Sequence, residues 1–303
     1  MVHIIISPVL KWAGGKTQLL PEINPKYPKK LHTGEIKTYI EPFLGGGAVF
    51  FDIYSRFPIK KAYLFDKNIE LIILYKVIQN DVNSLINKLS ILEENYLSLT
   101  PDNRNTFYYQ SRDIYNEFDK KIDTNTYDKD WLERAAFTVF LNRTCFNGLY
   151  RVNSKGHFNV PMGSYKNPKI LNEGNLRAVN QAFKIAEIQH KDFSEALKYA
   201  DESTFIYYDP PYRPISKTAS FNAYSSSDFD DNEQRRLRDV FVTASNQGAL
   251  QMLSNSDPTN YVDDTFFDKL YQEFNITRIS ASRMINSKGN SRGLIREILV
   301  FNY

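Results

Sequence analysis

The tetrapeptide Asp209-Pro210-Pro211-Tyr212 combines residue types that suit chemistry on an amino group. The Asp209 carboxylate and the carbonyl groups of Asp209 and Pro210 accept hydrogen bonds, neither proline has an N–H to donate, and the Tyr212 ring can stack on a planar ligand. Acceptors aimed at the hydrogens of an exocyclic amino group draw its nitrogen toward the tetrahedral geometry that attack requires. The motif therefore indicates nucleophilic attack by the amino nitrogen of adenine or cytosine. By itself it is equally compatible with an ordinary turn.

The residues before this motif predict where it lies in the fold. Residues 203–208 read Ser-Thr-Phe-Ile-Tyr-Tyr, a run typical of a buried strand. Proline cannot donate to a sheet ladder, so the strand must end near Asp209. Open α/β sheets bind ligands at the carboxyl ends of their strands, and we expect Asp209 at such an end.

Two glycine-rich segments indicate a nucleoside-like ligand. Residues 11–17 (Lys-Trp-Ala-Gly-Gly-Lys-Thr) lack the first glycine of a phosphate-binding P-loop, and they place Trp12 and Lys16 beside a predicted helix start. Residues 38–54 predict a strand, a turn containing Gly45 and Gly47, and a helix. A further strand, 61–66, ends in an acid close to the offset of about 20 residues at which a carboxylate meets ribose hydroxyls. We therefore expect an adenosine-like ligand without a phosphate.

A further predicted strand, 184–193, ends in Asp192 and Phe193, an acid and a ring that suit an adenine edge and face. Beyond it the pattern predicts a helix at 232–246 and strands at 249–255, 276–282 and 295–301. Residues 68–142 are instead helical in pattern. We expect an α/β catalytic domain of residues 1–67 and 176–303, interrupted by a target-recognition domain of residues 68–175.

Basic residues concentrate in two stretches of a chain whose net charge is only +3. Residues 142–172 and 275–296 each contain five Lys or Arg and no acid, which predicts two basic surfaces suited to a polyanion or, more simply, two solvated faces. Residues 149–153 and 157–160 predict a hairpin with Lys155 at its tip, and a two-stranded ribbon fits a DNA major groove. The loop with Arg283, Lys288 and Arg292 suits phosphate contacts.

Other classes of protein are disfavoured by composition. The single cysteine, Cys145, and four scattered histidines predict neither a disulfide framework nor a metal site. The sequence has no signal peptide pattern and no apolar run of about 20 residues, so we expect a cytoplasmic protein without a membrane partner.

Taken in their order along the chain, the motifs resemble those of the Dam-like adenine-N6 DNA methyltransferases, and most closely those of the DpnII-type modification methylases. The resemblance covers essentially the whole chain. It is carried by residues 11–16, Glu41-Pro-Phe-Leu-Gly-Gly-Gly47, Asp66, 147–151 with 159–163, and 209–212. Glu41 departs from the pattern, in which Asp is frequent.

The resemblance implies a Rossmann-like methyltransferase sheet, S-adenosyl-L-methionine as cofactor and S-adenosyl-L-homocysteine as product. The implied substrate is adenine N6 within GATC of double-stranded DNA, and the implied setting is a restriction-modification system with a cognate endonuclease. A base inside a duplex cannot present its amino nitrogen to the cofactor, so the adenine must flip out.

The resemblance also implies roles for individual residues. Asp209, Pro210, Pro211 and Tyr212 form the catalytic motif around the flipped adenine. The implied cofactor contacts are Trp12, Lys16, Glu41, Phe43, Gly45, Gly47, Asp66, Asp192, Phe193 and Asp209. The implied target-reading residues are Leu149, Arg151, Pro161 and Tyr165, with Phe146 and Asn147 near the flipped base.

Two alternatives remain open at this stage. One is a methyltransferase that acts on cytosine N4 or on adenine in RNA, which only mapping of the product distinguishes. The other is a DNA-binding regulator with a degenerate transferase fold, which would bind DNA without transferring a methyl group.

Overall fold

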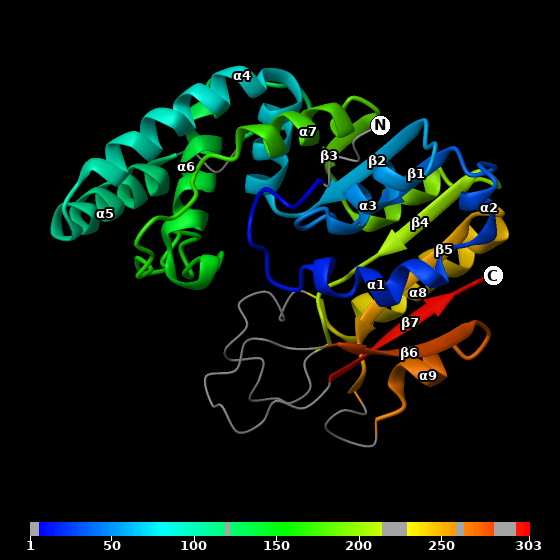
Figure 1. Ribbon diagram of the computed structural model, residues 1–303. Coiled ribbons are helices and arrows are strands. Elements are labelled where there is room, and N and C mark those ends of the chain that lie inside the picture. Colours follow the sequence, from blue (N-terminus) through cyan, green and yellow to red (C-terminus); the bar gives the residue numbers. More distant parts are fainter. Residues whose placement is uncertain (1–5, 119–121, 214–228, 259–263, 282–294) are drawn as a thin grey trace. The chain divides into compact units, whose positions relative to one another are not determined.

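The computed structural model describes residues 6–118, 122–213, 229–258, 264–281 and 295–303. Within these residues seven strands form one mixed sheet in the order β3-β2-β1-β4-β5-β7-β6 (Figure 1). The strands are β1 (Thr38–Glu41), β2 (Lys61–Asp66), β3 (Ala186–His190), β4 (Thr204–Tyr208), β5 (Leu250–Ser256), β6 (Asn275–Ala281) and β7 (Ile295–Phe301). The expected α/β fold is confirmed.

Strand direction places several acids at one edge of the sheet. β1 runs parallel to β2 and β4, and β4 runs parallel to β5. The carboxyl ends of these strands therefore point the same way, with Glu41 ending β1, Asp66 ending β2 and Asp209 directly after β4. β7 is antiparallel to β5 and β6, a departure from a purely parallel doubly wound sheet.

The chain divides into two compact units. Unit 1 comprises residues 1–15, 45–55 and 65–190, and unit 2 comprises residues 16–44, 56–64 and 191–303. The predicted recognition segment, 68–175, falls within unit 1. Its separate function remains a prediction.

Unit 2 is built on the buried strand β4, all five residues of which are inaccessible to solvent. Its long helix, α8 (Asp231–Asn246), packs on β5 and buries Leu237 and Phe241, while the Asp230 carboxylate caps its first turn by accepting from the N–H groups of Asn232 and Glu233. The shorter helices are η1 (Lys16–Gln18), α1 (Leu20–Ile23), η2 (Asn24–Lys26), α2 (Lys29–His32), η4 (Phe193–Lys198) and α9 (Phe266–Leu270).

Unit 1 is mainly helical, as the periodicity of residues 68–142 predicts. α4 packs against both α6 and α7, and α5 packs against α6 (Figure 1). None of the helices in the described ranges is both long and apolar enough to cross a membrane. The bounds are α3 (Ala48–Arg56), α4 (Ile69–Ser98), α5 (Pro101–Glu117), α6 (Trp131–Thr144), η3 (Phe146–Gly148) and α7 (Glu173–Phe183).

Two predictions need correction, the hairpin and the strand at 184–193. The hairpin at 149–160 is reduced to a single antiparallel bridge between Val152 and Phe158. Asn116 on α5 accepts from the Phe158 N–H at 2.7 Å and donates to its carbonyl at 3.1 Å, so a side chain takes the hydrogen bonds that a further strand would use. The strand predicted at 184–193 spans only Ala186–His190, and Asp192 instead caps η4.

A buried ion pair joins α4 to α6 and gives a test of the unit 1 fold. Arg134 donates two hydrogen bonds to Glu70, at 2.8 and 2.6 Å. Glu70→Ala leaves the guanidinium buried without its carboxylate, so we expect the free energy of unfolding to fall by about 3 to 5 kcal/mol. Glu173→Ala is the control, because it breaks an exposed pair with Arg177 that is worth less than about 1 kcal/mol. Urea unfolding followed by circular dichroism measures both, and equal losses would contradict this account.

Candidate functional site

Four side chains of unit 2 form a hydrogen-bonded network around the predicted catalytic motif. The Lys16 ammonium, on η1, donates to Asp209 Oδ1 at 2.6 Å and to the Tyr212 phenol oxygen at 3.0 Å. The Tyr212 hydroxyl in turn donates to Glu297 Oε1, on β7, at 2.5 Å. Ser254 donates to the other Glu297 oxygen at 3.1 Å. We call Lys16, Asp209, Tyr212 and Glu297 the catalytic network.

Burial sets the protonation of this network. Burial raises the pKa of Asp209 to about 6; the Lys16 ammonium opposes this rise and the Glu297 carboxylate adds to it. Burial by itself would lower the pKa of Lys16, but Asp209, Tyr212 and Glu297 raise it above its ordinary value. Near neutral pH, Lys16 is therefore cationic and Asp209 is an ionised acceptor.

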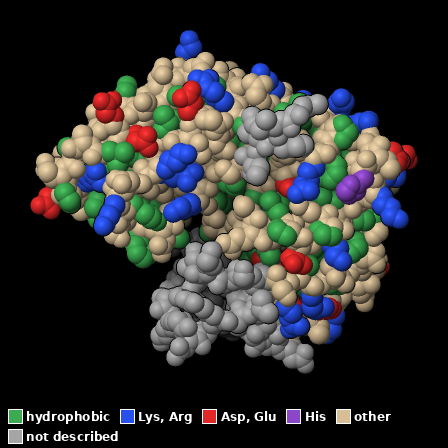
Figure 2. All heavy atoms as spheres, in the orientation of Figure 1, with side chains coloured by type: hydrophobic (Ala, Val, Ile, Leu, Met, Phe, Trp, Pro, Cys, Tyr) green, Lys and Arg blue, Asp and Glu red, His purple; other side chains and the backbone are tan. Residues whose placement is uncertain are grey.

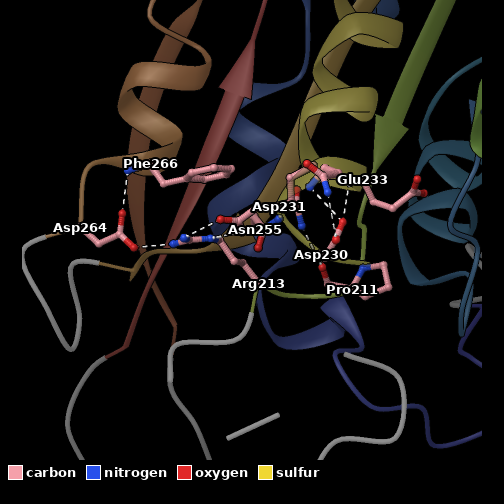
Figure 3. Close-up of polar contacts among 10 residues, drawn as sticks. Pro211, Arg213, Asp230, Asp231, Glu233, Asn255, Asp264 and Phe266 are labelled. Carbon is pink, nitrogen blue, oxygen red and sulfur yellow. Dashed lines mark hydrogen bonds and ion pairs between the residues drawn. The ribbon is translucent and has the colours of Figure 1, made fainter. Parts of the chain in front are cut away.

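The first turn of α8 holds the backbone that leaves this motif (Figure 3). Gln234, which is fully buried, donates to the Pro211 carbonyl at 3.2 Å and accepts from Asn255 at 3.5 Å. Three residues earlier on the same helix, Asp231 accepts two hydrogen bonds from Arg213, at 2.6 and 2.9 Å. The residues that precede and follow Tyr212, Pro211 and Arg213, are thus both hydrogen-bonded to the first turn of α8.

Arg213 has two further partners. Its guanidinium also donates to Asp264, and it lies 4.2 Å from the centroid of the Phe266 ring (Figure 3). The Phe266 N–H donates to Asp264 at 2.8 Å, which orients that carboxylate. Arg213 therefore joins the catalytic motif to the segment before α9.

Other predicted cofactor residues of unit 2 are engaged with their neighbours. Phe43 stacks on Phe193 with ring centroids 5.4 Å apart, and Arg236 lies 3.9 Å from the Phe193 ring. Arg236 also donates to both oxygens of Asp192, at 2.7 and 2.9 Å, and its hydrogen bonds hold the pKa of Asp192 well below its usual range. A ligand that uses Asp192 must share it with this arginine.

Glu41 is almost fully buried at the end of β1. Its carboxylate accepts from the Tyr39 hydroxyl at 2.8 Å. Burial and this carboxylate raise the pKa of Tyr39, so its hydroxyl remains a donor.

In unit 1 the glycine turn is tied to Asp66. The Gly45 N–H donates to one Asp66 oxygen at 2.8 Å, and the Asn68 N–H donates to the other at 2.7 Å. Gly47 has a φ of 73°, a conformation that glycine adopts without strain. A Cβ at Gly45 would lie 3.1 Å from Trp12 Cδ1, so the tight approach of the turn to Trp12 requires glycine there.

Trp12 also contacts the predicted recognition segment of unit 1. Its ring stacks on Tyr150, with centroids 5.1 Å apart and an interplanar angle of 29°. Asn142, on α6, links the backbone before Trp12 to η3: its side chain accepts from the Lys11 N–H at 2.8 Å and donates to the Gly148 carbonyl at 2.9 Å.

The recognition segment exposes several predicted DNA contacts. Phe146 is 51% and Leu149 37% exposed, although both are apolar. Asn147 between them has a φ of 56°, a conformation that is rare outside glycine. Cys145, just before them, is buried, and burial raises the pKa of its thiol to about 11.

Arg151 and Lys155 are exposed on the same segment. Arg151 donates from Nε to Asn159 Oδ1 at 2.8 Å, which fixes the plane of its guanidinium. Pro161 is exposed, and its carbonyl accepts from the Phe146 N–H at 2.9 Å. Tyr165 accepts from the Lys11 ammonium at 3.2 Å.

The face drawn in Figure 2 shows no single basic stripe: Lys and Arg side chains are mixed there with Asp and Glu. In the second acid-free stretch, Arg278 and Arg296 both pair with the buried Asp257. Arg283, Lys288 and Arg292 lie outside the described residues.

Comparison with known proteins identifies the family. The sequence profile of the D12 class N6 adenine-specific DNA methyltransferases matches residues 12–285. This chain belongs to that family.

Relatives of this methyltransferase match it over nearly their full length. The type II methyltransferase M.MjaIII of Methanocaldococcus jannaschii is 48% identical over 98% of this chain and 99% of its own. The type II methyltransferase M1.LlaDCHI of Lactococcus lactis subsp. cremoris is 38% identical, over 99% of this chain and 96% of its own. The DNA adenine methylase of Haemophilus influenzae is 31% identical, over 96% and 92%.

The sequence alone did not identify the residues whose side chains position the 209–212 motif by hydrogen bonds. Glu297 had a visible signal, because it is the one acid in a predicted strand at 295–301 whose residues, apart from Arg296, are otherwise apolar. Gln234 and Arg213 had none, since polar residues at a helix start and after a proline turn are ordinary. Only the fold brings them to the motif.

The pKa of Asp209 predicts a pH dependence. Protonation removes the negative charge with which Asp209 accepts hydrogen bonds, and its pKa is raised to about 6. Single-turnover methyl transfer should therefore be constant above this pH and fall roughly tenfold per unit below it. The rate measured from pH 5 to pH 8, with DNA binding followed in parallel, tests this. A rate that stays level down to pH 5 would contradict it.

Proposed function

We propose that this protein transfers a methyl group from S-adenosyl-L-methionine to N6 of adenine in double-stranded DNA, with the adenine flipped out of the helix. The observation that carries the proposal is the catalytic network, in which Lys16 donates to the Asp209 carboxylate directly after β4 and is itself held by the Tyr212 hydroxyl oxygen. An ionised, fixed acceptor is what an amino group needs in order to be held for attack.

The residues of this chain suit the cofactor. In unit 1, the Asp66 carboxylate accepts backbone N–H groups that fix its orientation, and a carboxylate of this kind is a suitable acceptor for a ribose hydroxyl. The adjoining turn carries glycine at positions 45 and 46, so only its backbone approaches Trp12. In unit 2, the partly exposed ring of Phe43, backed by the buried ring of Phe193, suits an adenine face. When bound, S-adenosyl-L-methionine supplies an electrophilic methyl group on a sulfonium sulfur.

The chain's own contribution to the reaction is to position the amino nitrogen. Asp209 and the Pro210 carbonyl accept the two hydrogens of the adenine N6 group, and the Tyr212 ring stacks on the base. Such stacking is worth roughly 1 to 3 kcal/mol and offsets part of the few kcal/mol that flipping costs. Because the leaving group is neutral, fixed geometry contributes more than strong acid or base catalysis.

We further propose GATC as the target and a restriction-modification system as the setting. Support comes from the resemblance to DpnII-type enzymes and from relatives named type II methyltransferases and DNA adenine methylase. A cognate endonuclease would then cut the same unmethylated site.

The decisive experiment is transfer of a labelled methyl group to DNA, followed by mapping of the modified base. We expect N6-methyladenine in parent reactions. Asp209→Ala should bind duplex DNA normally and give no product, and Asp209→Asn should give a small residual rate because it keeps one acceptor oxygen. N4-methylcytosine, methylated RNA alone, or near-parent activity in Asp209→Ala would reject the proposal.

The cofactor assignment predicts the effect of Asp66→Ala. Loss of the carboxylate removes the acceptors for the ribose and loosens the Gly45 turn, so calorimetric affinity for S-adenosyl-L-methionine should fall by about tenfold or more, that is about 1.4 kcal/mol. DNA affinity should stay within about twofold of the parent, since phosphate contacts lie elsewhere. Unchanged cofactor affinity would remove Asp66 from the site.

The specificity assignment predicts the effect of Arg151→Lys. If Arg151 forms a bidentate contact with a guanine, lysine keeps the charge and loses about 1 to 3 kcal/mol of discrimination. Methylation mapped by sequencing should spread to sites that differ from GATC by one base. Lys155→Ala is the matched control, because loss of a phosphate contact should weaken binding without changing site preference. An unchanged preference in Arg151→Lys would exclude it from base readout.

A further inference from the structure

We propose that Glu297 is a positioning residue of the reaction, which orients the Tyr212 hydroxyl and through it the Lys16 ammonium that holds Asp209. The inference rests on the function proposed above and adds β7 to the elements that build the site. It concerns a residue that the sequence motifs leave out.

The direction of the hydrogen bonds supports this role. A carboxylate only accepts, so the Tyr212 hydroxyl must donate to Glu297, at 2.5 Å. The phenol oxygen is then left to accept from Lys16 at 3.0 Å, while Lys16 donates to Asp209 at 2.6 Å. Each hydrogen bond in the network therefore has only one possible direction. The Glu297 carboxylate on β7 fixes that direction, because it can only accept from Tyr212.

Burial argues against a purely structural reason for an acid here. Glu297 is 7% exposed, and Ile298 and Leu299, which follow it on β7, are 1% and 0% exposed. Burying a carboxylate costs free energy that an apolar side chain would not. Glu297 meets that cost with donors from Tyr212 and Ser254, and its Oε2 lies 3.9 Å from the Lys16 nitrogen.

Glu297 also acts on Asp209 through its charge. The groups facing Asp209 are Lys16 from η1, Tyr212 three residues later in the motif, Tyr207 from β4 and Glu297 from β7. Among them Glu297 raises the pKa of Asp209 and Lys16 lowers it. Removing the negative charge at position 297 must therefore shift the ionisation of Asp209 to lower pH.

The test is Glu297→Gln in the full chain, with single-turnover methylation of a duplex oligonucleotide from pH 5 to pH 8. Glutamine keeps the size and one acceptor oxygen but loses the charge and can turn its amide toward Tyr212. We expect a rate at pH 7.5 that is roughly ten- to hundredfold lower than the parent, as misplacement of a reacting group produces. DNA affinity should be unchanged, and the acidic limb of the pH profile should move to lower pH.

Asp239→Asn is the matched control, because it removes one carboxylate from an exposed position on α8 beside Arg238. Its rate and its acidic limb should match the parent. Tyr212→Phe keeps the ring and removes the hydroxyl through which Glu297 acts. Glu297→Gln should then lower the rate much less in the Tyr212→Phe background than in the parent.

The outcomes separate this inference from the proposed function. Failure of the parent to methylate adenine would reject the function. An active parent with parent-like rate and acidic limb in Glu297→Gln would reject the positioning role, as would fully additive effects of the two substitutions. If circular dichroism finds Glu297→Gln unfolded, Tyr212→Phe decides the question: a rate loss of the same size supports the role, and a parent-like rate overturns it.

Discussion

The ion pair between Lys16 and Asp209 is the interaction on which the candidate site depends. It brings together two residues that lie 193 positions apart, one at the start of a helical turn and one directly after β4. Neither charge would be stable alone at this depth, because burial disfavours each of them. Their pairing keeps an anion beside the carboxyl end of the sheet, where it can face an amino group.

The surrounding protein holds this pair from several directions. η1 carries Lys16, Asp209 directly follows β4, β7 carries Glu297, and the first turn of α8 holds the backbone on either side of Tyr212. A four-residue motif therefore depends on elements drawn from both ends of the chain. Such preorganisation suits a reaction with a neutral leaving group, in which accurate placement supplies most of the rate enhancement.

Most of the fold could be predicted from the sequence, because period-2 and period-3.6 patterns are local. The strands β2, β4 and β7 and the helix α8 fall within a residue or two of their expected bounds. The hairpin could not be predicted correctly, because Asn116 on another element takes the hydrogen bonds of Phe158. For the site, Asp209 and Tyr212 were recognisable by type and spacing. Gln234 was not, and Glu297 was visible only as an acid in a predicted strand, since the partners of both are set by tertiary packing.

The chemistry of Cys145 has a practical consequence for observing this protein at work. It is the single cysteine of the sequence, it is buried, and its thiol stays protonated at neutral pH. Thiol-directed dyes react with exposed thiolates, so the native chain offers them almost no target. A cysteine introduced at the exposed position of Lys155 would take a single fluorophore without further engineering. Its emission would show whether the surroundings of this segment change when DNA is added.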